Sequence, residues 1–208
     1  MKKWGLVIET GGTSLQVGLL EGDTPVGGLR WDWPNQHSEK LIAAVCFLLK
    51  EAQLRWQDIQ FAVYHQGPGS HTGLRIGLSA IKAWALSLGW QIYPVSLMQV
   101  LYWWGRERVS NANFFTFWET RGQEWYGQLW NNGKPEPPQL LPAQKWNEQA
   151  AGRVWIGNHP TAHLYIEEVR WQLFAKGVSQ IPPLTSPEEI IGIVPLYFRE
   201  FLPTQRKR

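Results

Sequence analysis

Cysteine is almost absent from this 208-residue sequence, in which Cys46 is the only one. A disulfide within the chain is therefore excluded, which favours an intracellular, cytoplasmic location. Cys46 lies among apolar residues of an expected helix, so a buried, unreactive thiol is a better interpretation than a nucleophile. The amino-terminal residues lack the apolar core of a signal peptide, and no apolar run is long enough to cross a bilayer. We therefore expect no contact with a membrane.

A large excess of charge is also missing. The net charge is +3 and the isoelectric point is about 9.0. The one visible basic cluster is residues 206–208, which could contact RNA directly or could be a solvated end of the chain. By contrast, 44% of the residues are hydrophobic, which is enough for a packed core in one large domain or two small lobes.

Tryptophan is abundant, with 14 residues scattered from Trp4 to Trp171. Rows of aromatic residues can form stacking platforms for single-stranded nucleic acids when they line a basic groove. Here no basic residues alternate with the tryptophans in a regular way. Because each indole buries a large area, we interpret most of them as parts of the core or of half-exposed packing.

A glycine-rich string from Gly67 to Gly77, reading GPGSHTGLRIG, organises the first half of the chain. Residues 59–64 before it indicate a strand, and the apolar residues 74–88 after it indicate a helix. The glycines permit a sharp turn, and Ser70 or Thr72 could cap the helix. Free amides at such a helix start can hold a phosphate, but an unliganded turn has the same pattern. No lysine followed by serine or threonine completes a Walker-type P-loop.

The expected helix over residues 74–88 is apolar on nearly every side, because only Arg75 and Lys82 carry a charge. A helix of this kind is buried in its own core or against another chain. Gly73 and Gly77 would let a second helix approach closely. We therefore interpret this segment as a contact helix.

Near the start of the chain, residues 6–9 and 15–20 indicate two strands joined by a loop of small residues. In the sugar kinase, Hsp70 and actin superfamily, such a hairpin holds nucleotide phosphates, and an acidic residue holds Mg²⁺. The corresponding residues here would be Glu9, Thr10, Gly11, Gly12 and Thr13. Glu9 stands where that superfamily generally has aspartate, and the extra methylene displaces the carboxylate. Two alternatives follow: a small ATP-dependent phosphotransferase, or a vestigial phosphate loop in a protein without catalytic residues.

The rest of the first half adds a strand over residues 26–33 and a helix from residue 38. Apolar residues recur along this helix at helical spacing, namely Leu41, Val45 and Leu48. His37 lies at its start, either as a polar contact near the hairpin or as an exposed loop histidine. Three strands, a helix, a strand and a helix form the first half of a ribonuclease H-like lobe.

The second half has a looser pattern. It predicts helices over residues 96–108 and 161–175, a hairpin with strands 114–118 and 124–130, a loop at 134–138, a strand over 153–157 and a closing segment from 187 to 198. His159 and His163 have the spacing of two metal ligands on one helical face. Pro160 marks the expected start of that helix, however, and no glutamate follows His159 as in zinc peptidases. We therefore expect no metal site there.

Four segments together resemble the bacterial TsaB family. They are Ile8-Glu9-Thr10, His37-Ser38-Glu39, the string from Gly67 to Gly77, and Pro195-Leu196-Tyr197-Phe198-Arg199. The string is close to diagnostic, and the resemblance covers residues 4–105 well and the rest thinly. Two departures are His71, where the family usually has phenylalanine, and residues 119–122 (ETRG), where it typically reads DARR.

The resemblance implies a fold and a role. The fold would be α/β, with two ribonuclease H-like, actin-like (ASKHA) lobes of mixed sheets flanked by helices. One lobe would span residues 1–107 and a smaller one 108–208, with 187–208 returning to the first. The family is a noncatalytic accessory subunit of the machinery that makes threonylcarbamoyladenosine at position 37 of tRNA. It pairs with its catalytic paralogue TsaD, joins the ATPase TsaE in a ternary complex, forms a homodimer when alone, and meets tRNA indirectly.

The pairing surface that the resemblance implies lies on the first two helices. Carried onto this chain, its residues would be Leu41, Val45, Leu48, Ser70, His71, Arg75, Ile76, Leu78, Ile81 and Trp84. Two helices from each partner would then form a small bundle. The apolar character of the second helix independently favours a contact there.

Overall fold

Two β-sheets, one after the other along the chain, form the framework of the protein. The computed structural model describes residues 3–32, 36–120 and 123–196. The elements in chain order are β1 (Trp4–Glu9), β2 (Leu15–Glu21), β3 (Thr24–Trp31), α1 (His37–Glu51), η1 (Trp56–Asp58), β4 (Ile59–Gly67), α2 (His71–Leu88), β5 (Gln91–Ser96), α3 (Leu97–Arg106), β6 (Asn113–Glu119), β7 (Glu124–Asn131), β8 (Lys134–Pro135), β9 (Gln139–Pro142), α4 (Ala143–Gln149), β10 (Val154–Gly157), β11 (Leu164–Tyr165), η2 (Trp171–Lys176), α5 (Gly177–Gln180) and α6 (Pro187–Gly192).

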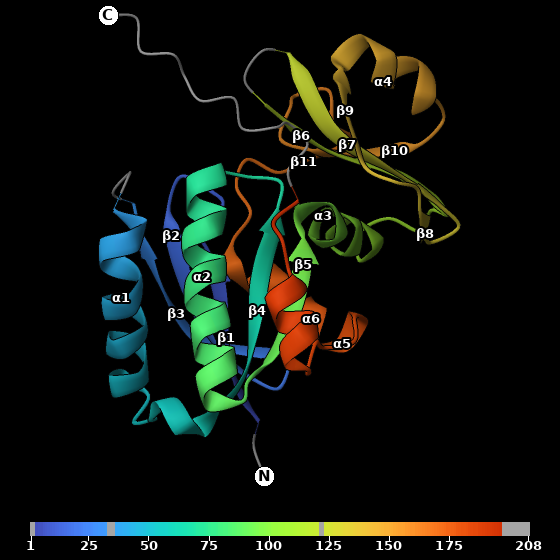
Figure 1. Cartoon of the computed structure of the whole chain (residues 1–208). Helices are drawn as coiled ribbons and strands as arrows, with labels where there is room; N and C mark the ends of the chain where they lie inside the picture. Colours follow the sequence, from blue (N-terminus) through green and yellow to red (C-terminus); the bar gives the residue numbers. More distant parts are fainter. Residues whose placement is uncertain (1–2, 33–35, 121–122, 197–208) are drawn as a thin grey trace, which may run out of the picture.

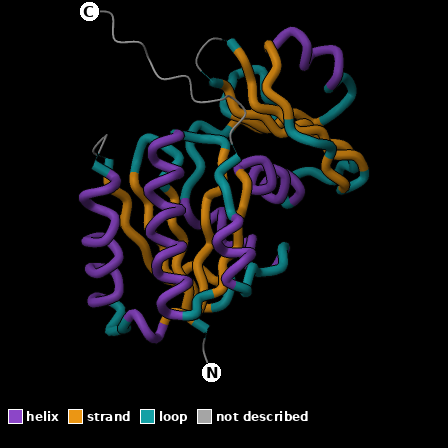
Figure 2. Tube along the Cα trace, viewed as in Figure 1, coloured by secondary structure: helices purple, strands orange, loops and turns teal. Residues whose placement is uncertain are grey.

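The first sheet has the strand order β3-β2-β1-β4-β5, in which β1, β2 and β3 are antiparallel neighbours and β4 and β5 run parallel to β1. This is the ribonuclease H-like order. Helices α1, α2 and α6 lie side by side on one face, and α3, α5 and η2 lie toward the other (Figures 1 and 2). The predicted α/β fold with mixed sheets flanked by helices is confirmed.

Alternation along β1 explains why both faces of this sheet are covered. Leu6 and Ile8 belong to the cluster under α1 and α2, whereas Val7 belongs to a second cluster with Phe174 of η2. All four side chains are fully buried. Successive residues of a strand point to opposite faces, so an uninterrupted apolar run produces a sheet that needs helices on both sides.

The second sheet has the order β11-β10-β6-β7-β8, with β9 also paired to β7. A compact aromatic cluster fills the space between it and α4, and consists of Phe115, Phe117, Trp125 and Trp146 with their neighbours. The Trp146 indole donates a hydrogen bond to the carbonyl of Trp125, 3.1 Å away. This lobe therefore has a core of its own, with aromatic rings in close contact.

After β11 the chain returns to the first sheet. Trp171 of η2 lies across β2 and β3, where a Cβ on Gly18 would be 1.9 Å from the indole and one on Gly28 would be 2.5 Å from it. Further on, Leu184 pairs with Ile92 of β5, and the amide of Leu196 donates to the carbonyl of Gln66, 2.8 Å away. The described part of the closing segment thus lies against the first lobe.

Most predicted elements are confirmed with shifts at their ends, and one is wrong. Residues 161–175 form no long helix: two residues join β11, and the 3-10 helix η2 begins at Trp171. The predicted loop at 134–138 contains the short strand β8, which pairs with β7. The third strand runs over Thr24–Trp31, and residue 33 lies outside the described residues, as do 121–122 and 197–208. Of the described helices, none has the length and hydropathy needed to span a membrane.

Candidate functional site

Helices α1, α2 and α6 form one outer layer, on which exposed apolar side chains collect. Eight large hydrophobic residues are exposed in the described chain, and six lie on this layer or directly after it: Ile42, Phe47, Leu86, Leu88, Ile191 and Val194. Their exposed fractions run from 37% to 63%. The Lys82 ammonium on α2 holds α6 in place through the carbonyl of Ile191, 2.6 Å away. We call this surface the outer helical layer.

Half of the predicted pairing residues lie in the core of the first lobe instead. The five are only 0% to 7% exposed, and they are Leu41, Val45, Leu48, Leu78 and Ile81. They form the side of α1 and α2 that packs on the sheet. Helical spacing marks an apolar face without saying whether the sheet or another chain covers it, and here the sheet covers it.

The other five predicted pairing residues are at least partly accessible. Ser70 and Arg75 are exposed, and His71, Ile76 and Trp84 are half-buried. Ser70 begins α2, since its Oγ accepts a hydrogen bond from the amide of Gly73. The Trp84 ring lies 5.0 Å from the Trp56 ring, centroid to centroid, so Trp84 helps to pack the C-terminal half of α2 against η1.

Cys46 is exposed, contrary to the prediction of a buried thiol. It lies one helical turn after Ile42, on the same side of α1, and Phe47 is exposed next to it in the sequence. The inward side of α1 is formed by other residues, including Ala44 and Leu49. His37, the first residue of α1, is buried rather than a free loop histidine.

The carboxylate of Glu9 is buried and takes up the free amides of the hairpin loop. Its Oε1 accepts hydrogen bonds from the amides of Gly11 (2.7 Å) and Gly12 (3.0 Å), and lies 2.8 Å from Nδ1 of His65. Its Oε2 accepts a longer bond from Gln16, at 3.4 Å. In a phosphate-binding hairpin these amides would face the anion. Here the Glu9 carboxylate is the anion, so the amides of Gly11 and Gly12 already have a hydrogen-bond acceptor within the chain.

The same loop is a poor fit for Mg²⁺. A hard cation needs several oxygen ligands, yet both oxygens of Glu9 are engaged inside the protein. In the described part of the chain, no group of three or more His, Cys, Asp or Glu side chains is arranged to hold a metal ion. The Nδ1 atoms of His159 and His163 each have a local partner: that of His159 lies 2.9 Å from Oγ1 of Thr161, and that of His163 accepts from the amide of Trp155.

The glycines of the string are explained by this loop. A Cβ on Gly69 would lie 2.6 Å from the carbonyl oxygen of Gly11, and one on Gly77 would lie 2.4 Å from Oγ1 of Thr10. The two glycines inside α2, Gly73 and Gly77, were predicted to admit a second helix. They admit the hairpin loop instead, and the string and the loop form one unit.

His65 is the site residue that sequence reasoning missed. It follows the predicted strand in β4, and its side chain is only 5% exposed. Its partner Glu9 is 56 residues away in sequence, and only the parallel pairing of β1 with β4 brings the two together. A single histidine in an apolar strand gives no signal of such a pair.

A cleft of about 950 Å³ opens beside this unit, bounded by the hairpin loop, the turn after β4, the ends of β6 and β7, and residues 167–169. Hydrogen bonds from Arg30 to Asp32 and Glu168 raise the pKa of the guanidinium, so this cation is paired at the edge of the cleft. Burial raises the pKa of Tyr126, which stays neutral. The cleft is thus a mixed polar and aromatic space between the two sheets.

A family model described as "TsaD: tRNA N6-adenosine threonylcarbamoyltransferase" matches residues 33–110, which include α1 and α2. A curated relative, the tRNA threonylcarbamoyladenosine biosynthesis protein TsaB of Bacillus subtilis (strain 168), is 36% identical over 172 residues, covering 76% of this chain and 72% of the relative. The chain belongs to the TsaB family.

Solved structures agree with the TsaB assignment at the level of the fold. A Pseudomonas aeruginosa structure described as an uncharacterized protein with similarity to peptidase YEAZ has a TM-score of 0.73 at 18% identity, over 95% of this chain and 100% of the other. YeaZ from the same organism has a TM-score of 0.70 at 19% identity, over 94% and 99%. The second half of this TsaB-family chain, where the sequence resemblance is thin, therefore keeps the shared architecture.

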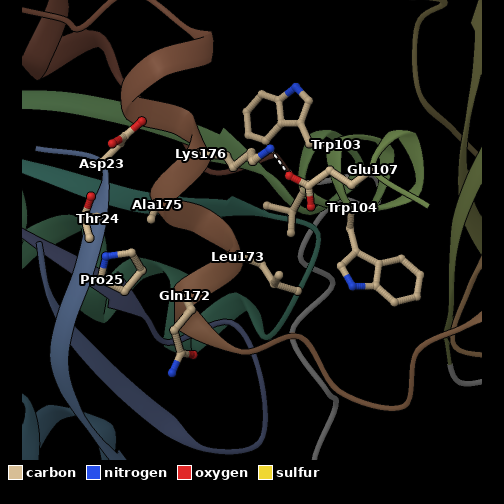
Figure 3. Close-up of a pocket in the computed structure, with 11 residues that line it drawn as sticks. Asp23, Thr24, Pro25, Trp103, Trp104, Glu107, Gln172, Leu173, Ala175 and Lys176 are labelled. Atoms are coloured by element: carbon tan, nitrogen blue, oxygen red, sulfur yellow. Dashed lines mark hydrogen bonds and ion pairs between the residues drawn. The ribbon is translucent and has the colours of Figure 1, made fainter. Parts of the chain in front are cut away.

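The TsaB-family chain also has a smaller hollow of about 340 Å³ next to α3 and η2 (Figure 3). Trp103 and Trp104 border it, and the Lys176 ammonium pairs there with the Glu107 carboxylate. The guanidinium of Arg108 lies over the Trp104 ring, 4.1 Å from the ring centroid, in a cation–π contact. Since Lys176 and Glu107 neutralise each other, this hollow offers less to a ligand than the cleft does.

Proposed function

We propose that this TsaB-family protein is a noncatalytic partner subunit that binds TsaD through the outer helical layer and so supports threonylcarbamoyl transfer to adenosine 37 of tRNA. In the same proposal TsaE joins the pair in a ternary complex, tRNA is met through the complex, and the isolated chain pairs with a second copy of itself. These events take place in the cytoplasm.

One observation carries the proposal: the gathering of exposed apolar side chains on the outer helical layer. Six of the eight large exposed hydrophobic residues of the described chain lie on it or directly after it. Single exposed apolar residues are ordinary, whereas a concentration on one face is typical of a protein contact. The name of the Bacillus subtilis relative supports the pathway, and the TsaD-type family model overlaps two of the three helices of this layer, α1 and α2.

A second observation supports a noncatalytic role. The hairpin loop, which would hold phosphate in an active relative, is occupied by the Glu9 carboxylate through the amides of Gly11 and Gly12. A bound nucleotide would compete with a carboxylate that is covalently part of the chain and already in position. The alternative of a small ATP-dependent phosphotransferase is therefore the weaker one.

A co-elution experiment tests the docking proposal. Purified chain and TsaD, mixed at micromolar concentration, are expected to elute together in size-exclusion chromatography. Phe47→Asp places a charge at a side chain that is 53% exposed, so the monomer keeps its fold while the contact gains an unpaired buried charge. We expect the affinity for TsaD to fall by about a hundredfold.

Tyr165→Asp is the matched control, because this residue is equally exposed, at 52%, and lies on β11 outside the outer helical layer. It is expected to leave the affinity unchanged. Equal affinities for the two variants would contradict docking through the outer helical layer. Saturable binding of Mg²⁺-ATP by the isolated chain, lost in Thr13→Ala, would favour the phosphotransferase instead.

A further inference from the structure

The outward side of α1 carries a line of exposed residues. Leu41, Val45 and Leu48 form the buried side of this helix. The exposed positions opposite them recur at steps of four, three and four residues, namely Glu39, Ala43, Cys46 and Lys50. Such steps keep side chains on one line along a helix, and we call these residues the α1 line. Ile42 and Phe47 flank it, one on each side, and are 58% and 53% exposed.

The α1 line begins with a carboxylate and ends with an ammonium group. Glu39 lies in the first turn of α1 and Lys50 in the last, and neither has an ion-pair partner in the part of the chain that the structure describes. Charges of these signs suit the helix dipole, which explains their positions but not the exposed apolar residues between and beside them. The short side chains of Ala43 and Cys46 in the middle would let a second helix approach closely.

The charges select the direction in which a second copy of α1 fits against the α1 line. A parallel copy would place Glu39 against Glu39 and Lys50 against Lys50, and like charges repel. In an antiparallel copy related by a two-fold axis, Glu39 faces Lys50 of the second copy and Ala43 faces its Cys46, because the members of each pair are equally far from the middle of the helix. A two-fold contact makes every such pair twice. The α1 line is therefore complementary to itself in the antiparallel direction.

The neighbouring helices of the outer helical layer lack this property. Helix α2 carries Arg75 and Lys82 but no carboxylate along its whole length, and the Lys82 ammonium is already bonded to the carbonyl of Ile191. Helix α6 carries Glu188 and Glu189 but no cation. Helix α1 lies at the edge of the layer, with α2 on one side of it (Figure 1). Of these three helices, α1 is the one whose own copy matches it in charge.

We propose that a second copy of this chain docks antiparallel along the α1 line, with Glu39 of each copy facing Lys50 of the other and with Ala43 and Cys46 in the middle of the contact. Phe47 of both copies then lies on one side of the contact and Ile42 of both on the other, so exposed apolar area is covered on each side. The inference rests on the self-pairing that is part of the proposed function, and it gives that pairing a direction, a register and its residues.

Sedimentation equilibrium of the full-length chain, from about 1 to about 100 µM at low salt, tests this contact. We expect the mass to rise from that of a monomer to that of a dimer. Glu39→Lys and Lys50→Glu each turn two attractions of the two-fold contact into two repulsions, so either variant should raise the dimer Kd by about tenfold or more. Both positions are exposed, so each monomer is expected to keep its fold, which circular dichroism checks.

Mixing the two single variants tests the direction and the register together. In a mixed pair the new ammonium of Glu39→Lys faces the new carboxylate of Lys50→Glu, and the unchanged Lys50 of the first chain faces the unchanged Glu39 of the second. Both contacts are attractive, so an equimolar mixture should pair with a Kd within about threefold of the parent, although neither variant pairs well alone. The double variant Glu39→Lys/Lys50→Glu reverses both charges within one chain and should dimerise as the parent does.

Glu148→Lys is the matched control, because this residue is exposed on α4 in the second lobe and the change alters the net charge as much as Glu39→Lys does. Alone, it should dimerise with the same Kd as the parent. Dye-labelled Lys50→Glu, followed by fluorescence anisotropy, should bind Glu39→Lys at least about threefold more tightly than Glu148→Lys. Equal affinities would mean that net charge alone draws the chains together, and would count against the proposed register.

Three results would overturn the proposal: a chain that stays monomeric up to about 100 µM, a dimer whose Kd is the same in both single variants as in the parent, or a mixture of the two variants that pairs no better than either alone. Co-elution with TsaD is a separate measurement. A chain that stays monomeric but co-elutes with TsaD removes this contact and leaves TsaD docking in place, whereas a chain that dimerises as expected but fails to co-elute does the reverse.

Discussion

The carbonyl oxygen of Thr10 lies so close to Gly73 that a Cβ on this glycine would be 1.9 Å from it. The loop between β1 and β2 is thereby pressed against the first turn of α2. The amide of Ser70 adds a hydrogen bond to the carbonyl of Gly11, 2.7 Å away. Two segments that are about 60 residues apart in sequence therefore behave as a single structural unit.

Gly73→Ala should disturb this unit. Neither the Thr10 backbone nor the helix can move far, so we expect the free energy of unfolding to fall by about 2 to 3 kcal/mol. Urea denaturation followed by circular dichroism measures the loss. Gly192→Ala, at a glycine in α6 with open space around it, is the control and should be neutral or slightly stabilising. A loss of the same size in both variants would contradict the role of the close contact.

Gln16→Leu should separate the hairpin from the returning segment. Its side chain donates toward Ser14 (3.2 Å) and the carbonyl of Val169 (3.3 Å), and accepts from the amide of Trp171 (3.0 Å). At about 1 kcal/mol for each bond, we expect a loss of about 2 to 4 kcal/mol in the free energy of unfolding. Gln172→Leu, at an exposed neighbouring position, should change the same urea midpoint little. Matching midpoints for the two variants would count against this prediction.

The exposed thiol of Cys46 reports on docking. It is the only cysteine, so any thiol adduct in the mass spectrum identifies this position. In the isolated chain at low concentration we expect complete labelling by a maleimide. If TsaD covers the outer helical layer, saturating TsaD should slow labelling at least about tenfold, because the reagent must wait for dissociation. An unchanged rate with TsaD bound would exclude α1 from the contact.

The pH dependence of stability should include a contribution from the start of α6. Hydrogen bonds from the backbone amides of Ser186 and Thr185 lower the pKa of the Glu189 carboxyl from its ordinary 4.5. A lowered folded-state pKa means that this stabilisation is complete above 4.5 and is lost as the pH falls through the lowered value. Glu189→Gln should therefore have a lower melting temperature than the parent at pH 7, and the difference should shrink on acidification. A difference that grows in acid would contradict the sign.

Local chemistry was sufficient to predict the first lobe. Strands with apolar runs, the small-residue loop after Glu9 and the cap at Ser70 each follow from nearby residues. The second half depended on pairing between distant segments: β11 exists because Leu164 pairs with Ile156 of β10, whereas the local sequence pattern predicts a helix there.

The candidate site was only partly predictable for a related reason. The family resemblance pointed to α1 and α2, but the pairing surface carried over from it included Leu41 and Ile81, which face the sheet; both sides of these helices carry apolar residues, so the sequence does not tell the two sides apart. The Glu9–His65 pair could not be predicted from the sequence, since it depends on how β1 and β4 align in the folded sheet. Spacing reveals which segments matter, whereas pairing across the fold decides what each side chain touches.

Trp171, which fits against Gly18 and Gly28 on the back of the first sheet, has a consequence for how the protein is made. While the ribosome is still synthesising the second sheet, the nascent chain already contains every strand of the first, together with α3, but lacks η2 and α5 on its rear face. These two helices, and Ile190, which closes the front cluster, emerge only later. The first sheet therefore keeps part of its apolar surface uncovered until η2 and α6, which are translated long after its own strands, have been made.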